Sequence, residues 1–153
     1  MNRYVRCFDN AFAYMKEKGW KKIYVGIDIH STCLEPTWSD KMSDVFYKYS
    51  EETLKMMTQD DEVCMILWSC SKPQTNKGYH EYFLNHNIKF DYINRNPEVP
   101  STDYADFETK MYFNVILDDK AAFMPEEDWK ELFSYFYERR WKKNIIKSSG
   151  III

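Results

Sequence analysis

The fold of this chain is decided by the stretch Lys21-Lys22-Ile23-Tyr24-Val25-Gly26-Ile27-Asp28-Ile29-His30-Ser31-Thr32. A run rich in Ile, Val and Tyr is bounded by lysines on one side and by hydroxyl residues on the other, which is typical of a buried parallel strand. We predict this strand over residues 22–29. Asp28 would then lie at the carboxyl end of the strand, and ligands bind at that edge in open α/β sheets.

Helices and strands are expected to alternate along the rest of the chain. Apolar residues at helical spacing predict helices over about residues 6–18, 39–58 and 75–86, and a final helix from Pro125. Apolar runs without that spacing predict strands over residues 62–69, 88–93 and 111–117. This alternation implies right-handed βαβ units and therefore an α/β fold with a doubly wound parallel sheet.

The chain is expected to form a single domain over residues 1–153. Residues 1–20 would be an N-terminal helical extension. Residues 144–153 show no clear partner and would be either a mobile tail or an added edge strand. The basic segment from Arg139 to Lys147 suits a helix C-terminus, where cations interact favourably with the dipole, although Trp141 could also stack on a nucleic acid base.

Composition narrows the class of protein. With 153 residues, of which 44% are apolar and 29% charged, the chain can bury its own core. The net charge of −3 gives no overall attraction to nucleic acid or to an anionic membrane. No apolar run approaches the roughly 18 residues of a membrane span. The four cysteines form no Cys-x-x-Cys pair and argue against structural zinc, so we expect a reduced, cytoplasmic protein.

Polar residues follow three of the expected strands, namely Asp28, Ser69 and the pair Asp118-Asp119. The carboxyl ends of parallel strands meet at one edge of a sheet, so these residues could converge. Lys110, just before the last strand, could reach the same edge. Two or three carboxylates in one crevice repel each other and need a cation. A site made only of oxygen atoms suits Mg²⁺.

In this order the motifs resemble those of the haloacid dehalogenase-like (HAD) hydrolase superfamily, from about residue 23 to residue 122. The first family motif, Asp-x-Asp-x-Thr/Val after an apolar strand, reads Asp28-Ile29-His30-Ser31-Thr32. The second, a strand ending in Ser or Thr, reads Leu67-Trp68-Ser69. The third is Lys110. The fourth, an apolar strand ending in two acids, reads Val115-Ile116-Leu117-Asp118-Asp119.

The resemblance implies a HAD-like Rossmannoid three-layer sandwich and a role for each motif residue. Asp28 would be the nucleophile that forms an aspartyl-phosphate. Mg²⁺ would be held by Asp28, the backbone carbonyl of His30 and Asp119, with Asp118 helping directly or through water. The phosphoryl group would be bound by the Ser69 hydroxyl, the Lys110 ammonium and the backbone N–H groups after the first strand, at Ser31 and Thr32.

His30 departs from the family pattern because it replaces the second acid of the first motif. In the family phosphatases, that acid protonates the leaving group and then activates water. An imidazole, with an ordinary pKa of about 6.5, can do both. His30 is therefore either an alternative acid/base or a sign of changed or lost turnover. Ser31 also stands where the family usually has Gly.

The spacing of the motifs leaves no room for a sizeable cap domain. The site would be open, with Trp38 and the loop Cys33 to Thr37 as its rim, or covered by a second copy of the chain in a homo-oligomer. We therefore expect a Mg²⁺-dependent phosphohydrolase that acts on a nucleotide, another small phosphorylated metabolite or a nucleic-acid end. The alternative is a degenerate binding or regulatory protein. A receiver-like phosphoacceptor fits less well, because receivers carry their acidic pair after the first strand.

Overall fold

An all-parallel sheet forms the centre of the computed structural model, which describes residues 1–150. Within these residues the sheet has four strands in the spatial order β3-β2-β1-β4. The register places Val25 of β1 between Met65 of β2 and Val115 of β4. The α/β class and the parallel sheet that the sequence predicts are thus confirmed. The strands are β1 (Ile23–Ile27), β2 (Val63–Leu67), β3 (Tyr92–Ile93) and β4 (Val115–Leu117).

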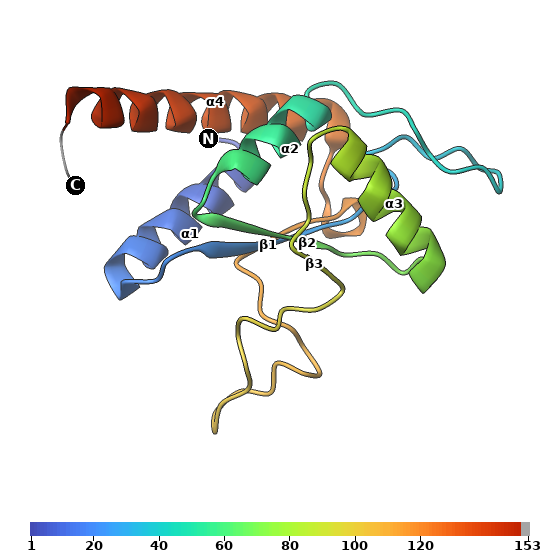
Figure 1. Cartoon of the computed structure of the whole chain (residues 1–153), viewed down its shortest axis with the longest axis horizontal. Helices are drawn as coiled ribbons and strands as arrows, with labels where there is room; N and C mark the ends of the chain where they lie inside the picture. The colour runs from blue at the N-terminus through green and yellow to red at the C-terminus, as the bar shows by residue number, and fades with distance from the viewer. Residues whose placement is uncertain (151–153) are drawn as a thin grey trace.

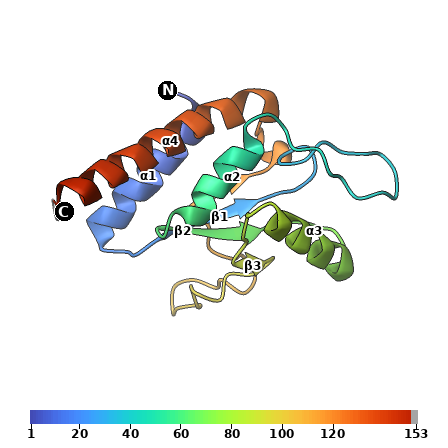
Figure 2. The same ribbon diagram turned by 45° about the horizontal axis from the view of Figure 1, so that its top comes forward.

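Helices connect and flank these strands (Figures 1 and 2). The Asn2 side chain caps the first helix by accepting the N–H groups of Tyr4 and Val5, and Gly19 ends it in the left-handed conformation. Pro73 and Pro125 occupy the first turns of two later helices, where no N–H is needed. The helices are α1 (Arg3–Lys18), α2 (Ser50–Gln59), α3 (Pro73–Asn85) and α4 (Pro125–Ser149), with a short 3₁₀ turn η1 (Asp119–Ala121).

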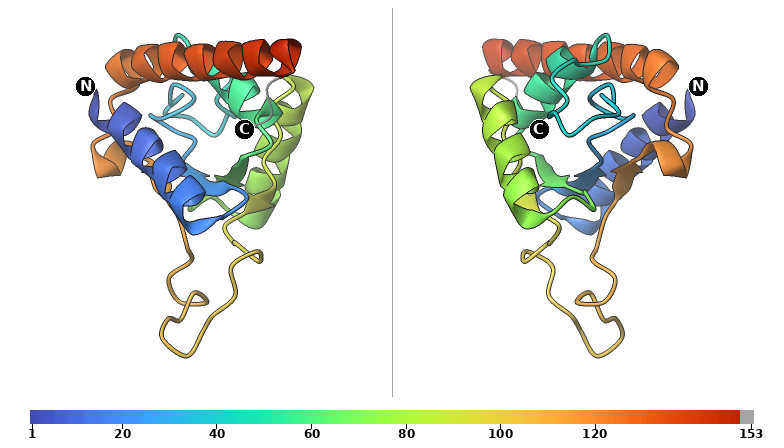
Figure 3. Two further views of the ribbon diagram at one scale, coloured as in Figure 1. Left: turned by 90° about the vertical axis from the view of Figure 1, so that its left-hand side faces the viewer. Right: turned by 90° about the vertical axis from the view of Figure 1, so that its right-hand side faces the viewer.

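The two faces of the sheet are covered differently. Ile23, Val25 and Ile27 of β1 belong to the main hydrophobic core, together with buried residues of all four α-helices. The alternate residues, Tyr24 and Gly26, face the long loop of residues 94–114, which lies on the opposite side of the sheet in Figures 1 and 3. The expected doubly wound, three-layer arrangement with helices on both faces is therefore not confirmed, because a loop covers the second face.

Glu98 fastens this loop to the sheet. Its carboxylate accepts hydrogen bonds from the Tyr92 hydroxyl at 2.7 Å and the Tyr24 hydroxyl at 3.4 Å, and pairs with the Lys22 ammonium at 2.7 Å. Farther along the loop, the Phe113 ring lies 2.8 Å from the position that a Cβ atom would take at residue 26. Only glycine fits at that point of β1.

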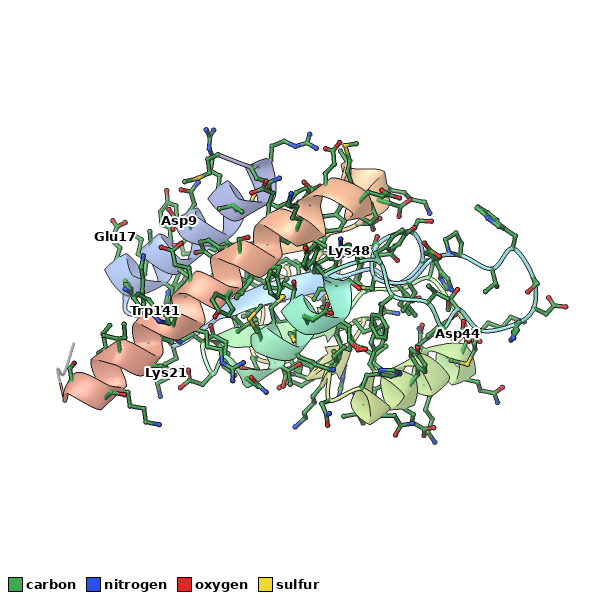
Figure 4. The ribbon with its side chains drawn as sticks, turned by 90° about the horizontal axis from the view of Figure 1, so that it is seen from above. Asp9, Glu17, Lys21, Asp44, Lys48 and Trp141 are labelled. Atoms are coloured by element: carbon green, nitrogen blue, oxygen red, sulfur yellow. The ribbon has the colours of Figure 1, made fainter. Side chains whose placement is uncertain are left out.

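The expected helix over residues 39–58 is wrong in its first half, because the helix begins at Ser50. Residues 34–46 instead form a hairpin, in which the Glu35 N–H donates to the Val45 carbonyl at 2.8 Å. Two tyrosines of α3 bind the backbone of this segment, since the Tyr79 hydroxyl accepts the Ser43 N–H and the Tyr82 hydroxyl donates to the Asp44 carbonyl. Figure 4 shows Asp44 beside α3. Contacts between distant segments thus override the local helical pattern.

All four strands are shorter than expected, and β3 and β4 lose most of their predicted length, whereas the last helix is longer. Side chains interrupt the backbone hydrogen bonds where β3 and β4 begin. Before β3, the Asp91 carboxylate accepts the Met65 N–H of β2. Before β4, the Asn114 side chain accepts the Tyr24 N–H of β1. The edge strand that was one alternative for residues 144–153 is wrong for residues 144–149, which continue α4. Residues 151–153 lie outside the described part of the chain.

Part of the basic segment on α4 is neutralised by acids of the same chain. The Arg139 guanidinium binds the Asp60 carboxylate at 2.7 Å and the Glu62 carboxylate at 2.9 Å, and it lies 3.6 Å from the centre of the Phe12 ring. The Lys143 ammonium binds both carboxylates as well. Trp141, labelled in Figure 4, is exposed on the same helix. Within residues 1–150, none of the helices combines the length and the apolar character required to cross a membrane.

Candidate acidic site at the carboxyl edge of the sheet

Asp28 and Asp118 follow two strands that lie side by side. From β1 the chain moves outward through β2 to β3 and then returns to the other side of β1 as β4, so the strand order reverses between β1 and β4. The Asp28 N–H extends the ladder by donating to the Leu117 carbonyl at 2.9 Å. A reversal of this kind opens a crevice at the carboxyl edge of a parallel sheet, which is where ligands bind in such folds.

Three carboxylates converge in this crevice and form an acidic triad of Asp28, Asp118 and Asp119. One oxygen atom from each lies within 4.8 Å of the others. Burial, followed by the negative charge of Asp118, raises the pKa of Asp28 to about 6. The triad is therefore short of positive charge, and its donors are all carboxylate oxygens. This donor set fits a hard divalent cation such as Mg²⁺.

Thr32 connects the members of the triad. Its fully buried hydroxyl donates to Asp28 Oδ2 at 3.1 Å and accepts the Asp119 N–H at 3.0 Å. Its carbonyl accepts a hydrogen bond from the Trp129 indole at 2.6 Å, which fixes the turn to α4. The backbone N–H groups of Ser31 and Thr32, which the sequence suggests as phosphate donors, donate instead to carbonyls of the same turn. Thr32 is thus a positioning residue for two aspartates.

An acidic cavity of about 420 Å³ opens beside the triad and includes Ser69 in its wall. Asn94 holds Ser69 in place, because its side chain accepts the Ser69 N–H and donates to the Ser69 carbonyl. The Ser69 hydroxyl oxygen accepts the Ser71 N–H at 3.1 Å, which leaves the O–H to donate to a ligand. The cavity is lined by Asp28, Trp68, Ser69, Cys70, Asn94, Asp118 and Lys120.

A lysine lines the acidic cavity, but it is Lys120 rather than the Lys110 that the sequence suggests. Lys110 is exposed in the loop of residues 94–114 and does not belong to the wall of this cavity. Nearby in the loop, Tyr112 packs against Trp20 and Tyr24, toward the amino end of β1. Lys120 escaped the sequence analysis because it follows the acidic pair in a polar turn, where a lysine carries no distinctive signal.

His30 lies beside the triad but lines a different cavity. Its Nε2 atom is 2.8 Å from the Tyr79 hydroxyl on α3, and burial lowers the pKa of His30. With Ser31 it lines a hairpin cavity of about 350 Å³, which is bounded by the hairpin and α3. The structure thus brings together Asp28, Ser69 and the acidic pair, while the side chains of His30, Ser31 and Lys110 lie outside the acidic cavity.

A second cluster of three acids, Asp60, Asp61 and Glu62, also has carboxylate oxygens within 4.8 Å of one another. It differs from the triad because Arg139 and Lys143 supply its positive charge. The hydrogen bonds from Arg139 and Lys143 hold the pKa of Asp60 below its ordinary value, despite burial. This cluster joins α4 to the turn before β2 and has no need of a metal ion.

The fold and this site define an α/β protein with a parallel sheet and an acidic cavity at the point where the strand order reverses. No family model matches the chain, and no curated protein matches its sequence. A solved structure of a conserved protein from Bacteroides thetaiotaomicron is similar to it, with a TM-score of 0.56 and 19% sequence identity. The match covers 77% of this chain and 92% of the other. At this identity the likeness shows the fold alone.

Proposed function

We propose that this protein is a HAD-like, Mg²⁺-dependent phosphohydrolase that acts on phosphomonoesters through an aspartyl-phosphate on Asp28. The observation that supports this function best is the convergence of three carboxylates within 4.8 Å at the carboxyl edge of the sheet. A hydroxyl from Ser69 and an ammonium from Lys120 line the same cavity. Carboxylates, a hydroxyl and a cation in one crevice are the groups that phosphoryl transfer requires.

The acidic triad would hold Mg²⁺ through Asp28, Asp118 and Asp119, which offer the oxygen donors that this ion prefers. When bound, the ion supplies positive charge between the carboxylates and a phosphoryl group. Burial and the negative charge of Asp118 together raise the pKa of Asp28, and a bound cation would offset both. The second acidic cluster needs none, since two side chains of α4 neutralise it.

Residues of the chain contribute to the phosphoryl transfer in different ways. Thr32 binds one oxygen of Asp28, which leaves the other oxygen to attack phosphorus. As the Asp28–phosphorus bond forms, the ester oxygen–phosphorus bond breaks, and the leaving alkoxide takes its proton from solvent water or from the His30 imidazolium if that ring turns toward the acidic cavity. Water then attacks the phosphorus of the aspartyl-phosphate, which releases inorganic phosphate and restores the carboxylate. Ser69 donates a hydrogen bond to the phosphoryl oxygens, and Lys120 offsets their charge.

One observation favours a second function, a degenerate protein that binds phosphorylated ligands without turning them over. The His30 ring contacts Tyr79 and lines the hairpin cavity, not the acidic cavity. To protonate a leaving group at Asp28, the ring would have to leave Tyr79 and turn toward the acidic cavity. A ring that stays on Tyr79 would leave the hydrolase without this acid/base.

The two functions separate in one set of assays on the purified chain. Phosphate release from p-nitrophenyl phosphate is measured with Mg²⁺ and with EDTA, and phosphate binding is measured by calorimetry. Release that needs Mg²⁺ supports the hydrolase. Binding of Mg²⁺ and phosphate without any release supports the degenerate protein.

His30→Ala tests the acid/base role separately. If His30 activates water, the variant forms the phosphoenzyme but hydrolyses it slowly, so phosphorylated protein accumulates in a quenched reaction. A matched variant, His80→Ala, removes a histidine that binds the Phe90 carbonyl outside both cavities, and it should turn over normally. Equal loss of phosphorylation and hydrolysis in His30→Ala would argue against the role.

A further inference from the structure

The hairpin cavity has the size and lining of a small-molecule site. Its volume of about 350 Å³ is at the lower end of the range for ligand pockets, which excludes a bulky polymer but admits a small ring system. Pro36, Trp38, Met42 and Tyr79 give it an apolar and aromatic wall. Hydroxyl groups from the hairpin and α3 add hydrogen-bonding capacity. Asp40 and Lys41 add one charge of each sign at the hairpin. An aromatic wall with such polar groups around it matches a planar ring with polar edges.

Trp38 is the residue in this wall that the fold itself does not explain. Its side chain is 90% exposed, so it adds little to the hydrophobic core. Its backbone has a φ of 57°, in the left-handed region that bulky residues rarely adopt. Unfavourable backbone geometry in a residue that does not pack is a feature of ligand-binding segments. An exposed indole over a small cavity is a stacking surface for a planar ring.

Two buried polar atoms without partners belong to residues that are next in sequence to lining residues of the hairpin cavity. Among residues 1–150, Ser43 Oγ and Asn76 Oδ1 are buried without a hydrogen-bond partner. Each is next in sequence to a lining residue, Met42 in the hairpin and Thr75 on α3. A buried polar atom without a partner is costly, so it is usually satisfied by an ordered water or a ligand.

The hairpin cavity also lies within reach of the nucleophile. Asp28 lines one cavity and His30 the other, and two residues of extended chain span at most about 7 Å. The backbone positions that contribute Asp28 to one cavity and His30 to the other are thus close to each other. A five-carbon sugar is long enough to bridge that distance and carry a ring into the hairpin cavity.

We infer that the hairpin cavity binds the base of a nucleoside monophosphate, with Trp38 stacked on the base, and that this class of phosphomonoester is the substrate. The inference rests on the proposed function, which places the phosphoryl group at Asp28. The base is held between the hairpin and α3, so substrate selection and phosphoryl transfer are assigned to different cavities.

The test measures binding and turnover separately. Asp28→Asn, which cannot form the aspartyl-phosphate, is titrated in Mg²⁺ with each of the four common ribonucleoside 5′-monophosphates and with ribose 5-phosphate. At least one nucleotide should bind roughly tenfold more tightly than the sugar phosphate, which lacks the base. Adding Trp38→Ala should remove that preference, and Trp38→Phe should retain most of it. The control Trp20→Ala changes another exposed indole, at the start of β1, and should leave the preference intact.

Phosphate release by the wild-type chain from the same five compounds then gives a separate result for the proposed function. Equal affinity for sugar phosphate and nucleotides, or a preference that survives Trp38→Ala, overturns the inference even if the chain is an active phosphatase. A preference that depends on Trp38, without phosphate release from any compound, supports the base site and rules out the hydrolase. If no compound binds to Asp28→Asn and the wild-type chain releases phosphate from none of them, both proposals fail.

Discussion

The two acidic clusters found among residues 1–150 have the same number of carboxylates but opposite electrostatics. In each, three carboxylates lie within 4.8 Å of one another. Arg139 and Lys143 lower the pKa of Asp60 in one cluster, whereas burial and the charge of Asp118 raise the pKa of Asp28 in the other. The comparison teaches that proximity of acids does not define a metal site. The informative property is that, within residues 1–150, no lysine or arginine forms an ion pair with the triad, which lies at an edge where ligands can enter.

The largest expected effect is on turnover. Asp28→Asn should reduce phosphate release by at least about a thousandfold, because an amide cannot form the acyl-phosphate bond. Asp61→Asn is the matched change in the second cluster, at a side chain that is 94% exposed, and should leave the rate unchanged. Steady-state assays with Mg²⁺ measure both. Comparable rates for Asp28→Asn and the wild type would eliminate Asp28 as the nucleophile.

The second effect is on folding. Arg139→Ala should lower the free energy of unfolding by about 3 kcal/mol, because it leaves the buried carboxylate of Asp60 without its main partner. Arg140→Ala removes an exposed neighbour on the same helix and should cost less than about 0.5 kcal/mol. Urea unfolding of both variants gives the comparison. Equal stability of the two would mean that the second cluster does not hold α4.

A third effect distinguishes the clusters by their response to metal. Saturating Mg²⁺ should raise the melting temperature of the wild type by roughly 5 °C, because the ion binds only the folded chain. Asp28→Asn should lose this shift. In EDTA the same variant should be more stable than the wild type by about 1 kcal/mol, since it relieves the repulsion within a half-buried triad. A metal-dependent shift that persists in Asp28→Asn and vanishes in Asp60→Asn would place the metal at the second cluster and contradict the proposal.

The smallest effect is a difference in pH dependence. Folding lowers the pKa of Asp60. Its contribution to the free energy of unfolding is therefore complete above the ordinary pKa of about 3.9 and is lost as the pH falls through the pKa of the folded state. Asp28 has the opposite sign: its raised pKa makes the charged form unfavourable, so its penalty is relieved as the pH falls from about 6 toward 4. Urea unfolding between pH 3 and 7 measures both effects. At the acid end, the free energy of unfolding should fall less steeply with falling pH in Asp60→Asn than in the wild type. Between pH 6 and 4, it should fall more steeply in Asp28→Asn than in the wild type. Identical profiles for the two variants would contradict this assignment.

The sequence was sufficient to predict the central strands and the convergence of the acids. An apolar run that ends in an acid is a local signal, and parallel topology brings the ends of such runs together. The convergence of Asp28 and Asp118 could therefore be predicted from the sequence. The hairpin was missed because Val45 and Phe46 continue a helical stripe, whereas the decisive partners, Tyr79 and Tyr82, lie on a distant helix. The position of Lys110 could not be predicted, because periodicity carries no information about the path of a long loop.

The loop that covers the second face of the sheet is attached at both of its ends. At its first end, Asn94 binds Ser69 and Glu98 binds Tyr92, while at its second end the Asn114 side chain accepts the Tyr24 N–H. The tip between them, residues 101–109, forms mostly local hydrogen bonds to Asp106 and Thr102 and projects from the body in Figure 3. That tip is where a fluorescent or affinity tag could be inserted at little cost to folding, which would give a labelled protein whose two cavities are unaltered.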